Sequence, residues 1–241
     1  GGRIELKILA LDSSSLTASV AIVENGKVIS EFFLNAGLTH SETLAPMIKS
    51  VFDCSNISPA EIDLYAVTIG PGSFTGLRIG LATIKAMALA NNRPCVGISS
   101  LHALALNTDK YKKTVCVCID ARRGGIYNAI FNVENGKIIR KTQDRAIYIE
   151  DLIVQLRNSN NVVEFIGDGA LICYNDMVSK WGSNNVSLIG EKDMYIKSSN
   201  VGFLAEEMYR EGIFTGACSL NPSYIKIPQA ERLLNENKLK M

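Results

Sequence analysis

The feature that most constrains this chain is an internal repeat. An apolar segment ends at Asp12, and a second apolar segment ends at Asp120, 108 residues later. Each aspartate is followed by a short turn, another apolar segment and the tetrapeptide Glu-Asn-Gly-Lys, which begins at Glu24 and again at Glu134. Asn-Gly is favoured in two-residue hairpin turns because both residues tolerate a positive φ. The recurrence predicts a duplicated unit that begins with three strands.

Helical patterns follow each predicted hairpin. In the first half, Thr39 and Glu42 form a capping box ahead of apolar residues at helical spacing up to Phe52. Ser58-Pro59 forms a second capped turn before an apolar strand. The later expected elements are a helix over 75–91, a strand over 95–98, a helix over 149–157, a strand over 162–166, a helix through residue 181 and a last helix over about 200–211.

Together these elements describe two βββαβα halves. That arrangement predicts an α/β fold of the actin-like, ribonuclease H-like (ASKHA) type, in which the strand turns of both halves face a cleft. The expected subdomains are residues 1–108, with the partner-binding helices, and 109–228. The last helix of the second subdomain is expected to pack back on the N-terminal half, and 229–241 forms a polar tail.

Charge and composition exclude some functions. The chain has 25 Lys and Arg residues against 24 Asp and Glu residues, a net charge of +1. Proteins that bind nucleic acid alone usually carry a concentrated basic excess, because phosphate neutralisation supplies much of the affinity. No apolar run is long enough to cross a membrane and no signal sequence precedes the first strand, so we expect a cytoplasmic protein.

Neither cysteine nor histidine forms a metal-binding pattern. None of the six cysteines has the C-x-x-C spacing of zinc or redox sites, and they are expected to be free thiols. Cys116 and Cys118 are expected to point to one side of a sheet as small core residues. The two histidines, His40 and His102, are far apart in sequence, and no third group completes a catalytic set with either. We therefore expect no metal and no catalytic residue in this chain.

The glycine-rich segment from Gly70 to Gly76 has two interpretations. It lies between a strand and a helix, where backbone amides, with Gly72 and Ser73 as candidates, would hold a phosphate. It lacks the lysine of a P-loop and the spacing of a dinucleotide-binding loop. The favoured interpretation is a tight strand-to-helix turn with Ser73 or Thr75 as the N-cap.

The helix that follows is apolar around almost its whole circumference. Such a helix must be buried on more than one side. Gly76 and Gly80 form a flat stripe that allows close approach of another helix. Burial within the chain and burial against a partner are about equally compatible with this pattern.

The aspartate turns differ from those of phosphotransferases with this architecture, which place glycines directly after the aspartate. Asp12 is followed by three serines, so close approach of backbone to a phosphate is hindered. Asp120 is followed by Ala121 and then Arg122 and Arg123, which would recognise an anion or form a solvated charged turn. Asp12, Gly72, Ser73 and Arg122 are thus weak candidates for cofactor binding.

These segments resemble the bacterial TsaB (YeaZ) family over nearly the whole chain. The matching stretches are Ile8–Ser13, Thr39–Ser41, Leu44–Met47, Gly70–Gly80 and Ile119–Arg122, of which Gly70–Gly80 is the most specific. The resemblance implies a cytoplasmic, non-catalytic subunit of the complex that transfers a threonylcarbamoyl group from threonylcarbamoyl-AMP to the adenosine beside the anticodon of ANN-decoding tRNAs. It implies a heterodimer with the catalytic relative TsaD, docking of the ATPase TsaE, and ATP, ADP and metal bound by the complex rather than by this subunit.

Several expectations accompany that resemblance. The chain is expected to contact tRNA only indirectly and to form a homodimer when no partner is present. The expected partner interface consists of Leu44, Met47, Ile48, Val51, Gly76, Gly80, Ile84 and Met87. The alternative function is an autonomous nucleotide-dependent phosphotransferase or hydrolase of the actin-like fold, which tight binding of ATP and magnesium to the isolated chain would favour.

Overall fold

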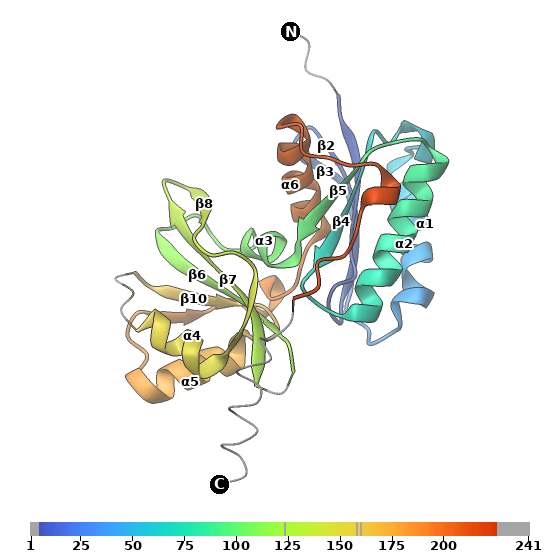
Figure 1. The fold of residues 1–241 in the computed structure, drawn as a ribbon. Coiled ribbons are helices and arrows are strands. Elements are labelled where there is room, and N and C mark those ends of the chain that lie inside the picture. Colours follow the sequence, from blue (N-terminus) through green and yellow to red (C-terminus); the bar gives the residue numbers. More distant parts are fainter. Residues whose placement is uncertain (1–4, 123, 158, 160, 226–241) are drawn as a thin grey trace. The chain divides into compact units, whose positions relative to one another are not determined.

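The computed structural model describes residues 5–122, 124–157, 159 and 161–225. The described chain divides into two compact units (Figure 1). Of the described residues, the first unit comprises 5–107 together with Tyr195–Ser223, and the second comprises the described part of 108–194 with Tyr224 and Ile225. In the described residues, no helix has the length and apolar character needed to cross a membrane.

The first unit is built on a five-stranded sheet with the strand order β3-β2-β1-β4-β5. β1 is antiparallel to β2, β2 is antiparallel to β3, and β1, β4 and β5 are parallel. The strands are β1 (Lys7–Asp12), β2 (Ala18–Glu24), β3 (Lys27–Leu34), β4 (Leu64–Gly70) and β5 (Cys95–Ser99). The helices are α1 (His40–Ser55), η1 (Pro59–Glu61), α2 (Phe74–Ala90), α3 (Ser100–Ala105), α6 (Ser198–Arg210) and η3 (Ala217–Ser219).

Helices cover both faces of this sheet, with α1 and α2 on one side and α6 on the other (Figure 1). Successive side chains of a strand point to opposite faces. Leu9 and Leu11 of β1 therefore join the core under α1 and α2, whereas Ala10 lies toward α6. A Cβ atom at Gly202 of α6 would lie only 2.6 Å from Val23, which shows how closely this helix approaches the sheet.

The second unit repeats the order of elements around a six-stranded sheet. Its path is β11-β10-β6-β7-β8, and β9 pairs with β7. The strands are β6 (Lys113–Asp120), β7 (Gly125–Glu134), β8 (Lys137–Arg140), β9 (Arg145–Tyr148), β10 (Val163–Ile166) and β11 (Val186–Leu188). The helices are α4 (Ile149–Leu156), α5 (Ala170–Trp181) and η2 (Glu191–Asp193). The predicted α/β fold of two βββαβα halves is confirmed, and the second unit contains two further strands that were not predicted, β9 and β11.

The second core contains the cysteine pair. Cys116 and Cys118 are fully buried, and their sulfur atoms lie 3.7 Å apart on one side of β6. Burial, followed by hydrogen bonds with Cys116 and Cys173, raises the pKa of the Cys118 thiol. These residues are free thiols that act as small core side chains, as expected.

The observed division of the chain differs from the predicted subdomain boundary in one segment. The sequence-based division placed 109–228 in the second subdomain, whereas Tyr195–Ser223 belongs to the first unit. Glu31 of β3 explains this, because its carboxylate accepts hydrogen bonds from the backbone and the hydroxyl of Ser199, at 2.8 and 2.9 Å. The predicted polar tail, 229–241, lies outside the described residues.

Candidate functional site

The turn after Asp12 is the first of the two repeated aspartate turns, and Asp12 is one of the candidate cofactor-binding residues. The Asp12 side chain is fully buried at the end of β1. Its Oδ1 accepts hydrogen bonds from the hydroxyls of Ser14 and Thr68, both at 2.6 Å, and from the Ser14 backbone amide. Burial raises the pKa of this carboxyl group, and the hydrogen bonds from Ser14 and Thr68 oppose that shift. Asp12 therefore holds β4 and the β1–β2 turn together.

The glycine-rich loop packs directly on the same turn. The Ser73 backbone amide donates a hydrogen bond of 2.7 Å to the Ser14 carbonyl oxygen, and the Ser13 hydroxyl donates to the Gly76 carbonyl oxygen at 2.9 Å. A Cβ atom at Gly72 would overlap the Ser14 carbonyl, and one at Gly76 would overlap the Ser13 carbonyl. Glycine is thus required here for close packing between the turn and α2.

This geometry favours the tight-turn interpretation of the loop. The Ser73 side chain caps α2 by accepting a hydrogen bond from the Gly76 amide at 3.2 Å. The Ser73 amide, one of the groups that would bind a phosphate, already has the Ser14 carbonyl as its acceptor. A carbonyl oxygen carries partial negative charge, so it would repel an anion placed at the same amide.

His40 connects a third element to this turn. It is the first residue of α1, and its Nε2 lies 2.9 Å from the Ser15 carbonyl oxygen. The ring also contacts α2, since a Cβ atom at Gly76 would lie 3.1 Å from His40 Cδ2. The β1–β2 turn therefore fixes the positions of the N-terminal ends of both α1 and α2.

Most of the expected interface residues lie in the core of the first unit. The side chains that face the sheet are those of Leu44, Met47, Ile48, Val51 and Ile84. Gly76 and Gly80 are buried against the β1–β2 turn, and Met87 is half-buried against the same core. A regular apolar stripe on a helix covers whatever apolar layer is beneath it. Here that layer is the chain's own sheet, so the fully buried residues of the expected interface have their contacts within the chain, whereas Met87 remains partly exposed.

The two helices expose a different apolar set, which we call the exposed α1–α2 surface. Phe74 is 52% exposed and Leu89 is 57% exposed, at opposite ends of α2. The Arg78 guanidinium lies 3.8 Å from the centre of the Phe74 ring. The surface consists of Ala45, Pro46, Phe74, Ala82, Ala86 and Leu89. In the sequence, the absence of a polar face on α2 was the signal for this exposed surface. Periodicity did not identify which apolar face of the helix remains exposed.

The equivalent turn in the second unit is more open. Asp120 is half-buried, and its Oδ1 accepts a hydrogen bond of 2.7 Å from the Arg122 amide, where the backbone φ is 70°. The Asp120 amide donates to Asp168 Oδ1 at 2.9 Å. Burial raises the pKa of Asp168, with a smaller contribution from the charge of Asp120. The Arg122 side chain is exposed, and Arg123 lies outside the described residues.

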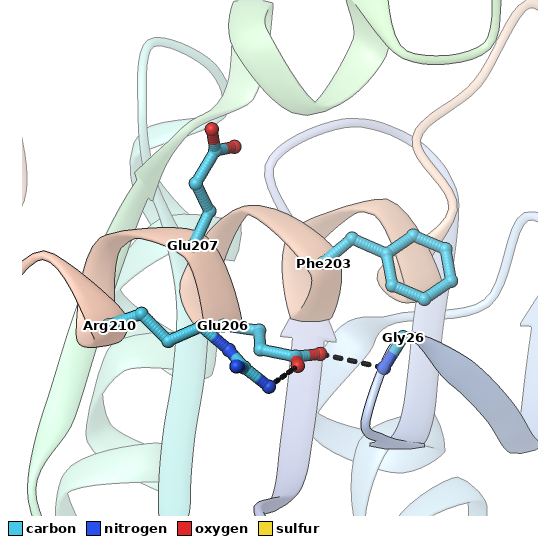
Figure 2. A pocket seen from close by; sticks show the side chains of 5 residues that line it. All are labelled: Gly26, Phe203, Glu206, Glu207 and Arg210. Carbon is cyan, nitrogen blue, oxygen red and sulfur yellow. Dashed lines mark hydrogen bonds and ion pairs between the residues drawn. The ribbon is translucent and has the colours of Figure 1, made fainter. Parts of the chain in front are cut away.

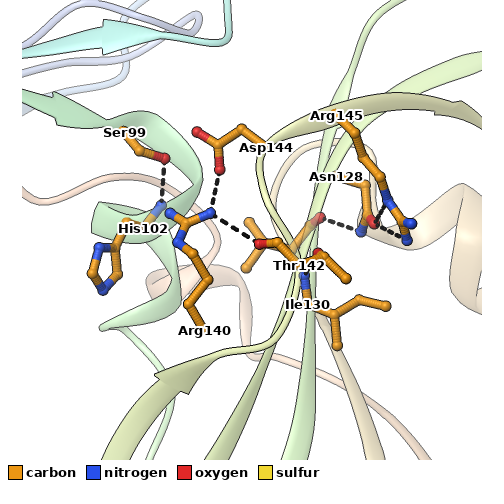
Figure 3. Close-up of polar contacts among 9 residues, drawn as sticks. Ser99, His102, Asn128, Ile130, Arg140, Thr142, Asp144 and Arg145 are labelled. Atoms are coloured by element: carbon orange, nitrogen blue, oxygen red, sulfur yellow. Dashed lines mark hydrogen bonds and ion pairs between the residues drawn. The ribbon is translucent and has the colours of Figure 1, made fainter.

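His102 and an unexpected arginine occupy ordinary structural positions. Figure 3 shows the Ser99 hydroxyl accepting a hydrogen bond from the His102 amide at 3.1 Å, which caps α3. Within the second unit, Arg145 donates to the buried Asn128 Oδ1 at 3.0 and 3.1 Å, and desolvation lowers the pKa of this arginine. Sequence reasoning did not identify Arg145, since its partners come from other segments.

A surface hollow lies beside α6 in the first unit (Figure 2). Its lining residues are Gly26, Phe203, Glu206, Glu207 and Arg210. The Glu206 carboxylate accepts hydrogen bonds from the Gly26 amide at 2.8 Å and from Arg210 at 2.6 Å. These contacts attach α6 to the β2–β3 hairpin turn. Among the described residues there is also no cluster of three or more histidine, cysteine or acidic side chains suited to a metal ion.

Comparison with known proteins supports the architecture. A structure titled as a protein with similarity to peptidase YEAZ from Pseudomonas aeruginosa superposes with a TM-score of 0.79, covering 92% of this chain and all of that chain at 23% identity. YeaZ from Pseudomonas aeruginosa gives a TM-score of 0.77, with 91% of this chain and 100% of that chain covered at 24% identity. The two repeated units, each with an aspartate at the end of its first strand, give the chain an α/β fold of the actin-like type.

Sequence comparison identifies the family within that class. Residues 34–235 match the family model described as TsaD, tRNA N6-adenosine threonylcarbamoyltransferase. TsaB from Bacillus subtilis is 26% identical over 94% of this chain and 96% of its own length, and TsaB from Escherichia coli is 30% identical over 61% of this chain and 64% of its own length. A transferase from Clostridium kluyveri is matched over only 48% of its length. The chain belongs to the TsaB (YeaZ) family, within the wider group that the transferase model describes.

Proposed function

We propose that this chain takes part in the biosynthesis of threonylcarbamoyladenosine in tRNA, as a non-catalytic subunit that binds and activates a TsaD-type transferase. The observation that carries the proposal is the match to TsaB from Bacillus subtilis along nearly its full length, whereas the match to the Clostridium kluyveri transferase covers about half of that protein. The relatives named TsaB are described as tRNA threonylcarbamoyladenosine biosynthesis proteins.

The exposed α1–α2 surface supports the binding role. Phe74 and Leu89 are large apolar side chains that are more than half exposed, and the alanines between them allow close approach of another helix. Exposed apolar side chains on neighbouring helices are typical of protein interfaces. The same surface would form the homodimer when the transferase is absent.

The β1–β2 turn supports the non-catalytic role. Asp12 is enclosed by Ser14 and Thr68, and the Ser14 carbonyl accepts the hydrogen bond of the Ser73 amide. A nucleotide phosphate would have to displace these contacts. In this proposal ATP or ADP, the metal ion and the ATPase TsaE act on the complex, and this chain alone binds none of the cofactors.

The test is binding between the purified chain and the TsaD protein of the same organism, measured by size-exclusion chromatography and calorimetry. We expect a stable heterodimer, and Ala86→Arg should weaken it at least tenfold because it places a charge on the exposed α1–α2 surface. Asn175→Arg is the control, since it adds the same charge at an exposed position of α5.

One outcome would contradict the expected interface, and another would contradict the non-catalytic role. The first is equal affinity for wild type and both variants, which would exclude this surface as the interface. The second is tight, stoichiometric binding of ATP and magnesium by the isolated chain, which would favour the autonomous phosphotransferase or hydrolase.

A further inference from the structure

One end of the second sheet carries a concentrated positive charge. The loop before β6 and the turn between β7 and β8 lie side by side, because Lys113 pairs with Val133 in the antiparallel register. The side chain of Lys110 also passes 4.0 Å from the position that a Cβ atom at Gly136 would occupy. Residues from two separate segments therefore form one surface.

The charge at this end contrasts with the neutral balance of the whole chain. Segments 109–113 and 134–141 contain six basic residues and only two acidic ones, Asp109 and Glu134. Part of the charge is neutralised locally. Lys113 lies 2.8 Å from Asp109 and 2.9 Å from Glu164, and Lys141 lies 3.0 Å from Glu134.

Arg140 also forms an ion pair, with Asp144, which leaves three lysines of the six basic residues. Within the described residues, no ion pair involves Lys110, Lys112 or Lys137, and all three are exposed. Lys112 lies close enough to Glu134 for its charge to contribute to the lowered pKa of that carboxyl group, although hydrogen bonds from Lys141 and Asn132 contribute more. Three cations thus project from one edge with little compensation.

An aromatic ring lies among these lysines. Tyr111 is 77% exposed, the highest value among the large exposed hydrophobic side chains of the described residues. Exposed lysines alone are ordinary surface residues. Lysines that flank an exposed aromatic ring form the combination that binds nucleic acids, since ammonium groups contact phosphates and the ring stacks on a base.

We propose that Lys110, Tyr111, Lys112 and Lys137, which we call the basic edge, contact the RNA substrate directly. The lysines bind backbone phosphates, and Tyr111 stacks on an unpaired base. This inference rests on the proposed function, because it takes tRNA as the substrate of the complex. It adds a direct RNA contact to a chain whose net charge of +1 predicted only an indirect one. Local clustering, rather than net charge, decides whether phosphates are bound.

The salt dependence of tRNA binding tests the role of the lysines. Anisotropy of a fluorescently labelled tRNA transcript is measured with the complex of this chain and the transferase, from 50 to 200 mM salt. We expect K110A/K112A/K137A to weaken binding about tenfold or more at low salt, and to reduce the slope of log K against log salt by about 2. The control K27A/K180A/K192A removes the same charge at exposed positions elsewhere and should change neither quantity.

A second variant separates stacking from charge. Tyr111→Ala should weaken tRNA binding about tenfold without changing the salt slope, and Tyr111→Phe should restore binding, because stacking requires the ring but no ionic group. If K110A/K112A/K137A and Tyr111→Ala both bind tRNA as tightly as the wild type does, the basic edge does not contact RNA. Loss of binding to vesicles of anionic phospholipid, with tRNA binding unchanged, would also overturn the proposal and assign the edge to a membrane surface.

The same preparations distinguish this proposal from the proposed function. Chromatography of each variant with the transferase reports heterodimer formation independently of RNA. If the wild-type chain fails to bind the transferase, the proposed function fails. If all variants form the heterodimer and only the basic-edge variants lose tRNA affinity, both proposals are supported.

Discussion

Asp12 and Asp120 end equivalent strands of the two repeated units, but their surroundings differ. Asp12 is fully buried, and its turn is covered by α1 and by the loop that leads into α2. Asp120 is half-buried, and its turn includes Gly124, where an added Cβ atom would meet open space. The comparison shows that equivalent turns of a duplicated fold can differ in role: the Asp12 turn is packed against helices, whereas the Asp120 turn is accessible to solvent.

The largest expected effect comes from filling the space at Gly76. This residue lies in a helix, where alanine is ordinarily favoured over glycine by about 1 kcal/mol. A Cβ atom here would overlap the Ser13 carbonyl, so we expect Gly76→Ala to lower the free energy of unfolding by at least about 2 kcal/mol. Urea unfolding measures this change.

The matched variant in the second unit is Gly124→Ala. Its cost should be about 1 kcal/mol, since only the positive φ of 76° opposes the substitution. If Gly76→Ala is neutral or stabilising, the first turn is not packed as tightly as the structure indicates.

Replacing the two aspartates should also lower the free energy of unfolding by different amounts. Asp12→Ala leaves the buried hydroxyls of Ser14 and Thr68 without their acceptor, and we expect a loss of about 2–3 kcal/mol. Asp120→Ala removes the acceptor of a backbone amide near solvent and should cost less than about 1 kcal/mol. Equal losses in denaturant unfolding would contradict the comparison.

A smaller effect is expected in the pH dependence of stability. The raised pKa of Asp12 means that the folded state holds its proton more tightly than the unfolded state, so stability falls as the pH rises from the ordinary carboxyl pKa of 3.8 through the pKa of the folded state. Asp12→Asn removes this contribution. The stability of the wild type relative to Asp12→Asn should therefore decrease with rising pH over that window and become constant above it.

Thermal unfolding at several pH values measures this difference. Because Asp168 also has a raised pKa, Asp168→Asn provides the comparison from the second unit. A difference between wild type and Asp12→Asn that does not change with pH would show that the Asp12 pKa is not raised.

The smallest effect concerns the N-cap of α2. Ser73→Ala removes the oxygen that accepts the hydrogen bond from the Gly76 amide and should cost about 1 kcal/mol. α5, the equivalent helix of the second unit, begins after Gly169 and has no side-chain cap. Calorimetry that shows no change for Ser73→Ala would mean that the packed turn alone fixes the start of α2.

The repeat allowed the fold to be predicted because each half carries its own local signals. The Asn-Gly turns and capping boxes specify connections within a few residues, and α1 begins where the Thr39 box predicts. β9 was missed because it has only four residues and is defined by its pairing with β7. For α6, local signals could not show which residues it contacts, because its contacts with Glu31 and Val23 join segments far apart in sequence.

The candidate surface was predicted only in part for a similar reason. Periodicity shows that α2 is apolar on more than one face, but the position of the sheet decides which face is core. Ile84 faces the sheet and Ala86 faces outward, although both are apolar residues of the same turn. The basic edge was missed because its lysines come from two segments, and net charge averages over the whole chain.

The packing of α6 on the first sheet has a consequence for synthesis of the protein. The face of that sheet formed by residues such as Ala10 and Val23 is covered by Ser198–Arg210, which the ribosome produces after Thr108–Met194 of the second unit. A nascent chain that ends near residue 108 therefore presents an uncovered apolar sheet face. The N-terminal unit completes its folding last, and until then it is the part of the chain most exposed to aggregation and to chaperones.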